Sequence, residues 1–168
     1  MSPKKTSSKG KEPKATRPHM PGYGITEKKN GMFPWKWAVD RLGKTKQYWI
    51  ATTRPDGSPH VMVIWGLWLE DEFWFSTGRK SRKARNLEAN PRCVICSDNS
   101  AEAVIVEGEV ETVEDASILK KVFAAYQKKY KMDVSGMGEP MFRVRPRVVF
   151  GLFEKKFGQT ATRWLFAA

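Results

Sequence analysis

The sequence predicts a mainly β protein in which an antiparallel barrel of strands carries helices at its periphery. Runs rich in β-branched and aromatic residues alternate with turn residues from residue 47 to residue 166. One segment, residues 114–130, has a long helical pattern of apolar residues. A chain of 168 residues suffices for one domain with a sizeable core. We therefore expect a single domain over residues 22–168, preceded by a tail over residues 1–21.

The tail is rich in Lys, Ser, Pro and Gly and has almost no apolar side chains. It cannot bury enough surface to fold alone, so we expect it to be disordered. Residues 1–30 hold eight Lys/Arg against two Glu, which is half of the net charge of +12. This charge indicates an anionic partner. The tail is either a nucleic-acid or membrane-surface arm or a solubilising extension, and we favour the extension.

No apolar run is long enough for a secretory signal or a membrane span. We expect a cytoplasmic protein that does not associate with membranes.

The body is expected to begin with a helix and a pair of strands. Pro34 suits a first helical position, and apolar residues recur at helical spacing up to residue 43. Residues 47–53 form a β-rich run that ends at the tight turn of residues 54–57. Residues 60–69 return as a second strand.

This second strand is apolar on both faces. Val61, Val63, Trp65 and Leu67 occupy one face, and Met62, Ile64 and Trp68 occupy the other. A strand with two apolar faces is covered on both, so we expect it between the core and either a ligand or a second subunit. His60, at its start, is more often a structural residue than a catalytic base.

The next strand leads into a basic helix. Aromatic residues 73–75 are followed by Ser76, Thr77 and a glycine, and then by a short helix that ends at residues 90–91. Five of the seven residues 79–85 are basic. A helix start supplies unpaired N–H groups and the positive end of a dipole, and cations add charge-assisted hydrogen bonds. The pattern suits an anionic group, and a solvated basic helix is the alternative of equal weight.

The second half of the chain alternates strands with one long helix. We expect strands over residues 93–98, 104–113, 142–153 and 160–166, and a helix over residues 114–130. Pro146 lacks a backbone N–H and limits pairing early in the third of these strands.

Cys93 and Cys96 form a lone C-x-x-C in a predicted strand, where residues three apart point to opposite faces. This spacing disfavours both a local disulfide and a shared metal ion, so we expect buried free thiols and no metal site. No nucleophile motif is present, and no side chain is singled out as catalytic. If the protein is an enzyme, a cofactor must supply the reactivity.

Three segments resemble the pyridoxamine 5'-phosphate oxidase family of flavin and deazaflavin oxidoreductases. They are residues 48–61, residues 75–77 and, as the strongest, Ser-Arg-Lys-Ala-Arg-Asn-Leu-Glu-Ala-Asn-Pro-Arg at residues 81–92. The resemblance covers about residues 33–166. It implies a mainly β (α+β) split β-barrel, a six-stranded antiparallel Greek key with peripheral helices. It also implies a homodimer with the cofactor in a groove between the subunits.

The resemblance further implies that Arg82 and Lys83 hold the cofactor phosphate, with Ser76 and Thr77 alongside. The strand from Val61 to Trp65 would lie along the isoalloxazine ring. The expected cofactor-binding residues are Val61, Met62, Val63, Ile64, Trp65, Ser76, Thr77, Lys80, Ser81, Arg82, Lys83 and Arg163.

The C-terminal region departs from the vitamin oxidases, whose substrate-phosphate segment contains a histidine. Residues 160–166 keep Arg163 but have no histidine, so we do not expect pyridoxamine phosphate oxidase activity. The ending looks more like a bacterial branch of reductases that use FMN or the deazaflavin coenzyme F-420. Arg79, Lys80 and Arg85 would suit the anionic tail of F-420, and they would also suit solvent.

We therefore expect an FMN- or F-420-dependent oxidoreductase that acts on a small organic substrate. One alternative is a cofactor-binding or carrier protein without turnover. A weaker alternative is a nucleic-acid-binding protein that uses the tail and the basic helix, since the body carries no recognised nucleic-acid module.

Overall fold

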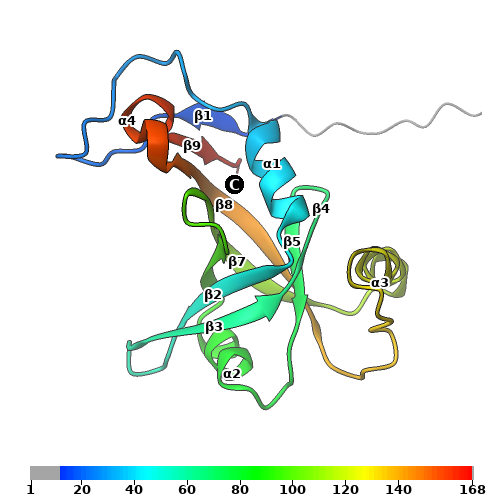
Figure 1. Cartoon of the computed structure of the whole chain (residues 1–168). Helices are drawn as coiled ribbons and strands as arrows, with labels where there is room; N and C mark the ends of the chain where they lie inside the picture. Colours follow the sequence, from blue (N-terminus) through cyan, green and yellow to red (C-terminus); the bar gives the residue numbers. More distant parts are fainter. Residues whose placement is uncertain (1–11, 168) are drawn as a thin grey trace, which may run out of the picture.

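The structure, a computed structural model, describes residues 12–167. Within this range nine strands form one antiparallel sheet, and helices lie around it (Figure 1). The strands are β1 (Lys14–Thr16), β2 (Gln47–Thr53), β3 (Pro59–Trp65), β4 (Leu67–Leu69), β5 (Glu72–Ser76), β6 (Arg92–Ser97), β7 (Glu102–Val113), β8 (Met141–Phe153) and β9 (Thr162–Leu165). The helices are α1 (Trp35–Lys44), α2 (Arg82–Ala89), α3 (Ala116–Tyr130), the 3-10 turn η1 (Glu154–Lys156) and α4 (Phe157–Thr160).

The sheet curls into an open barrel. Its order is β1-β9-β8-β7-β6-β2-β3, and β5 pairs with both β8 and β4. The long strand β8 is the branch point, because its first residues pair with β5 and its later residues with β9. No ladder joins β3 to β4 or β5 among the described residues, so the barrel is split along β3. The expected antiparallel barrel is confirmed, with β2, β3, β5, β6, β7 and β8 as its six main strands.

The core fills the inside of this barrel. Ile50, Ile95, Val106, Val149 and Trp164 lie in one row across five neighbouring strands, and each is almost completely buried. Their neighbours in each strand point outward, as the period of two requires. Helix α1 closes one end of the barrel with its apolar side (Figure 1).

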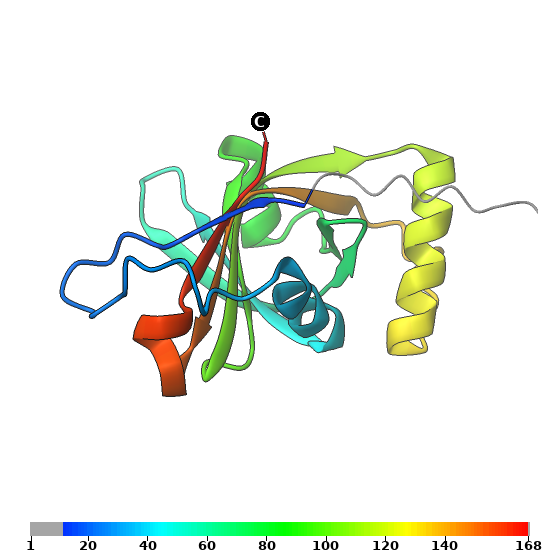
Figure 2. The same ribbon diagram turned by 90° about the horizontal axis from the view of Figure 1, so that it is seen from above.

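A second apolar cluster lies between the barrel and α3. Phe73 and Phe75 point into the barrel, whereas Trp74 points to the other side and packs with Val122 and Tyr126 of α3. The Tyr126 hydroxyl donates a 3.0 Å hydrogen bond to the Trp74 carbonyl oxygen. The three aromatic residues of β5 are therefore buried on both faces. In Figure 2, α3 stands beside the barrel and not over one of its ends.

The last turn of α3 is anchored by a lysine. Lys129 Nζ donates to the Tyr48 hydroxyl at 2.8 Å and to the Gly66 carbonyl oxygen at 2.9 Å. Burial, and to a lesser degree the charge of Lys46, lower the pKa of Lys129 to about 8. The Tyr130 hydroxyl donates to the same Gly66 carbonyl at 2.7 Å.

The expected strand over residues 60–69 is interrupted at Gly66. A Cβ at this position would overlap the ring of Phe73, which crosses the backbone there. The chain bends, and β4 pairs with β5 in place of β2. Trp68 is consequently buried and does not extend the exposed face of β3.

Ordered structure begins earlier than expected. β1 lies within the segment expected to be a disordered tail, and it pairs with β9. The expectation of disorder therefore fails for this part of the segment, while residues 1–11 lie outside the described range. None of the described helices is long and apolar enough to cross a membrane.

Candidate functional site

The connection between β5 and α2 forms the centre of the candidate site. β5 ends at Ser76, and α2 begins at Arg82 after a short turn. Ser81 is the N-cap of α2, and its hydroxyl accepts a 3.2 Å hydrogen bond from the Ala84 N–H. The first N–H groups of a helix have no partner within the helix, and here the side-chain cap satisfies the group of Ala84. The others are suited to an anion at the helix start.

Two of the predicted hydroxyl groups converge at this helix start. Thr77 Oγ1 lies 3.3 Å from Ser81 Oγ. Ser76 is directed elsewhere, because its hydroxyl donates to the Pro140 carbonyl oxygen at 3.0 Å. The structure therefore brings Thr77 and Ser81 together and engages Ser76 with the chain that enters β8.

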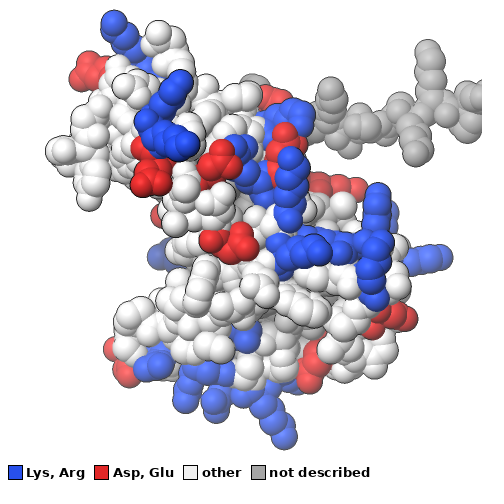
Figure 3. All heavy atoms as spheres, in the orientation of Figure 1, with Lys and Arg blue, Asp and Glu red and all other residues white. Residues whose placement is uncertain are grey.

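Five cations surround the same turn. They are Arg79, Lys80, Arg82, Lys83 and Arg85. None of them forms an ion pair within the described part of the chain. Lys83 is partly buried, and this burial lowers its pKa. Figure 3 shows Lys and Arg side chains gathered at the lower end of the molecule, where Figure 1 places α2.

This donor set fits an organic phosphate. Charge-assisted hydrogen bonds from cations, hydroxyl donors and helix N–H groups are the contacts that phosphate oxygens accept. A partly buried ammonium without a carboxylate partner is costly to desolvate, and a bound anion would offset that cost. The predicted residues Thr77, Ser81, Arg82 and Lys83 share one turn, and Lys80 flanks it on the exposed side.

The strand β3 presents an exposed apolar surface near this turn. Val61, Met62, Val63 and Trp65 are 51%, 46%, 43% and 47% exposed, whereas Ile64 is buried. Val61 and Met62 point to opposite faces of the strand, and both are exposed in one chain. The expected cover of the strand by a ligand or a second subunit stays a prediction. Contiguous exposed apolar residues mark binding or association surfaces.

The outer face of the sheet links β3 to Arg163 by a continuous row. Directly paired residues point to the same face, and the row runs through Val63, Trp49, Cys96, Ile105, Phe150 and Arg163. Four strands separate β9 from β3, so Arg163 is not beside α2 within one chain. Its Nε instead donates to Thr16 Oγ1 at 3.0 Å.

A polar chain beside the helix start was missed by sequence reasoning. Asn86 is fully buried, and its Nδ2 donates to Thr52 Oγ1 at 2.9 Å. Thr52 Oγ1 in turn lies 3.4 Å from His60 Nδ1. The sequence did contain a sign of this chain, because Thr52 and Asn86 are polar residues at positions that the apolar periodicity assigns to the core.

The described residues contain neither a reactive thiol at Cys93 nor a cluster of metal ligands. Cys93 and Cys96 are free thiols; Cys93 is buried as expected, whereas Cys96 is only partly buried. Burial raises the pKa of Cys93 to about 12, which keeps the thiol protonated and unreactive. Within residues 12–167 no three His, Cys, Asp or Glu side chains are grouped so that they could hold a metal ion.

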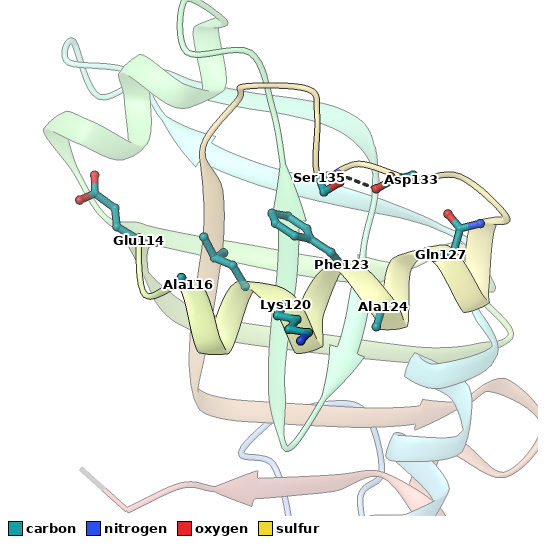
Figure 4. A pocket seen from close by; sticks show the side chains of 9 residues that line it. Glu114, Ala116, Lys120, Phe123, Ala124, Gln127, Asp133 and Ser135 are labelled. Atoms are coloured by element: carbon teal, nitrogen blue, oxygen red, sulfur yellow. Dashed lines mark hydrogen bonds between the residues drawn. The ribbon is translucent and has the colours of Figure 1, made fainter.

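A groove on α3 lies outside this arrangement. It has a volume of about 600 Å³ and is formed by one side of α3 and the loop after it, with Phe123 facing the loop (Figure 4). In that loop Ser135 N donates to Asp133 Oδ1 at 2.9 Å. None of the predicted cofactor residues lines this groove.

Comparison with known proteins identifies relatives of this fold. The sequence profile of the family described as pyridoxamine 5'-phosphate oxidase matches residues 36–153. No curated protein matches by sequence. A solved structure named F420 reductase has 25% identity and a TM-score of 0.55, with 70% of this chain and 98% of that chain covered.

Two further solved structures have lower identity. A putative pyridoxamine 5'-phosphate oxidase from Listeria innocua has 15% identity and a TM-score of 0.58, with 68% of this chain and 94% of that chain covered. HutZ, a heme storage protein from Vibrio cholerae, has 20% identity and a TM-score of 0.59, with 72% and 94% covered. At these identities the likeness concerns the fold alone.

Proposed function

The chain belongs to the pyridoxamine 5'-phosphate oxidase family and has its split-barrel fold, and we propose that it is an oxidoreductase that uses FMN or the deazaflavin F-420. The observation that carries this proposal is a group of cations at the start of α2 that form no ion pair with the described residues. The hydroxyls of Thr77 and Ser81 and an exposed apolar strand lie beside them. The F420 reductase among the similar structures supports the same class of cofactor.

In this proposal the phosphate binds at the start of α2. Arg82 and Lys83 supply charge-assisted hydrogen bonds, and Thr77 and Ser81 supply hydroxyl groups. The tricyclic ring supplies the transfer of hydride or electrons, while the protein positions it and excludes water. No side chain of this chain is assigned as a general acid or base.

The tricyclic ring is proposed to lie against β3. The exposed side chains of Val61, Met62, Val63 and Trp65 offer an apolar surface of the kind that a flat aromatic ring covers. One chain leaves this surface open, so a second copy is proposed to complete the groove. Within one chain four strands separate β9 from β3, so Arg163 is proposed to reach the site from that second copy.

A cofactor carrier is the main competing function. The heme storage protein among the similar structures shows that this fold also serves proteins named for storage. The two functions differ in turnover and not in the residues that bind the cofactor. A nucleic-acid-binding role rests on the basic residues alone.

Spectroscopy and turnover test the proposal together. The purified protein is titrated with FMN and with F-420, and binding is followed by the absorbance and fluorescence of each cofactor. The reduced form of the bound cofactor is then mixed with a quinone acceptor, and its reoxidation is compared with that of the free cofactor. Tight binding with faster reoxidation is expected. Binding without any acceleration by a range of acceptors would favour a carrier, and the absence of binding would refute both.

A further inference from the structure

His60 is connected to the middle of α2 through two buried polar residues, Thr52 and Asn86. Asn86 donates to Thr52 Oγ1 at 2.9 Å, and Thr52 is paired with His60 in the β2–β3 ladder. Asn86 lies three and four residues after Lys83 and Arg82, which places the three side chains on one side of the helix. The imidazole ring therefore lies on the side of β3 that faces the two predicted phosphate ligands.

The Thr52 hydroxyl suits either protonation state of His60. Its oxygen accepts from Asn86 and lies 3.4 Å from His60 Nδ1. A hydroxyl has one donor and two acceptor positions, so it can donate to a neutral ring or accept from a protonated one. Nε2 of His60 has no hydrogen-bond partner among the residues described, and this nitrogen is left for a ligand.

The charges that act on His60 are all positive. Burial lowers the pKa of His60 most, followed by the charges of Arg54, Lys83 and Arg82. Among the described residues, no carboxylate is a cause of this shift. Without a ligand this lowered pKa favours the neutral ring. An anion bound among these cations makes the electrostatic potential at His60 less positive, and this favours the protonated ring.

We propose that His60 is a further phosphate-binding residue, which takes up a proton when the cofactor phosphate binds beside Arg82 and Lys83. This inference rests on the proposed function, since it takes the phosphate site as its premise. Binding coupled to proton uptake must weaken as pH rises. The proton comes from solvent, and it makes Nε2 a charged donor toward the phosphate.

Nuclear magnetic resonance of the histidine rings tests this directly. The sequence has two histidines, His19 and His60, so the His60→Gln variant assigns both signals. The rings are titrated in the free protein, with FMN and with riboflavin, which has the same ring but no phosphate. We expect FMN to raise the pKa of His60 by about one unit or more, with no such rise for riboflavin and no change at His19.

Affinity gives an independent readout. F-420 is the ligand for this measurement, because its phosphate is esterified on both sides and does not titrate between about pH 6 and about pH 8. If binding shifts the pKa of His60 by one unit, the dissociation constant of the wild type for F-420 should rise by up to about tenfold over this range. It should stay nearly constant in the His60→Gln variant. An unchanged His60 titration in a protein that binds FMN, or an equal rise with riboflavin, would overturn the inference while leaving the cofactor site intact. If the protein bound neither FMN nor F-420, the proposed function would be refuted, and the inference with it.

Discussion

The hydroxyl oxygens of Thr77 and Ser81 lie 3.3 Å apart at the start of α2, between the end of β5 and the first helical cations. Ser76, one residue earlier, points to the Pro140 carbonyl. This difference separates two residues that sequence reasoning treated alike. We expect Thr77→Val to weaken cofactor binding by roughly tenfold or more, since a hydrogen bond to a charged group contributes about 1.5–3 kcal/mol. Ser76→Ala is the matched control, and equal losses for both variants in a binding titration would contradict the arrangement.

The cations outside the proposed phosphate site allow a test that separates the two cofactors. The deazaflavin carries carboxylates beyond its phosphate, and Arg79, Lys80 and Arg85 are the exposed cations available to them. Each exposed pair contributes only about 0.2–1 kcal/mol. Changing all three to Ser should weaken F-420 binding by roughly fivefold or more at low salt and leave FMN unaffected. The difference should shrink in high salt. Equal effects on both cofactors, or none, would show that these cations do not contact the tail of F-420.

The exposed face of β3 predicts a homodimer. Val63 is 43% exposed in one chain, so Val63→Lys does not place a charge in the barrel core. The substitution should place the lysine charge in the proposed interface, so the variant should sediment as a monomer at micromolar concentration. Met137→Lys is the control, because Met137 is 57% exposed in the loop after α3. A wild-type protein that sediments as a monomer would contradict the dimer.

Lys129 predicts a dependence of stability on pH. Its pKa is lowered from 10.5 to about 8 in the folded protein. Between these values the unfolded chain binds more protons, so the free energy of unfolding contributed by this group rises with pH. After allowance for the partial exposure of Lys129, the free energy of unfolding of the wild type should rise by roughly 1–2 kcal/mol relative to that of Lys129→Met from about pH 7 to about pH 10. The control variant Lys128→Met changes a lysine in the same turn, and its free energy of unfolding should depend on pH as that of the wild type does. Urea denaturation measures these differences, and a constant gap for Lys129→Met would contradict the lowered pKa.

Much of the fold was accessible from local sequence. The bounds of β2 coincide with the predicted residues 47–53, because this run combines β-branched and aromatic residues and ends at an Asp-Gly turn. The end of α2 was also predictable, since the helix was expected to end at residues 90–91 and its last residue is Ala89.

The misses came from long-range contacts. Gly66 interrupts the second strand because the Phe73 ring occupies the space of a Cβ, and periodicity carries no information about that contact. β1 forms because β9 offers it a pairing edge, although its own sequence is polar. The chain from Asn86 through Thr52 to His60 joins residues up to 34 positions apart, so it became visible only with the barrel assembled.

The central claim is that Arg82 and Lys83 hold the phosphate of a flavin or deazaflavin. The direct measurement is the dissociation constant of FMN and of F-420 for the wild type and for the double variant Arg82→Ala, Lys83→Ala. A matched control removes Lys120 and Lys121, two cations of α3 away from the site. Circular dichroism confirms that each variant is folded.

Loss of two charge-assisted contacts should weaken binding by roughly a hundredfold or more, at about 1.5–3 kcal/mol for each. The α3 control should bind as tightly as the wild type. Wild-type affinity of the Arg82→Ala, Lys83→Ala variant for both cofactors would contradict the assignment of the site.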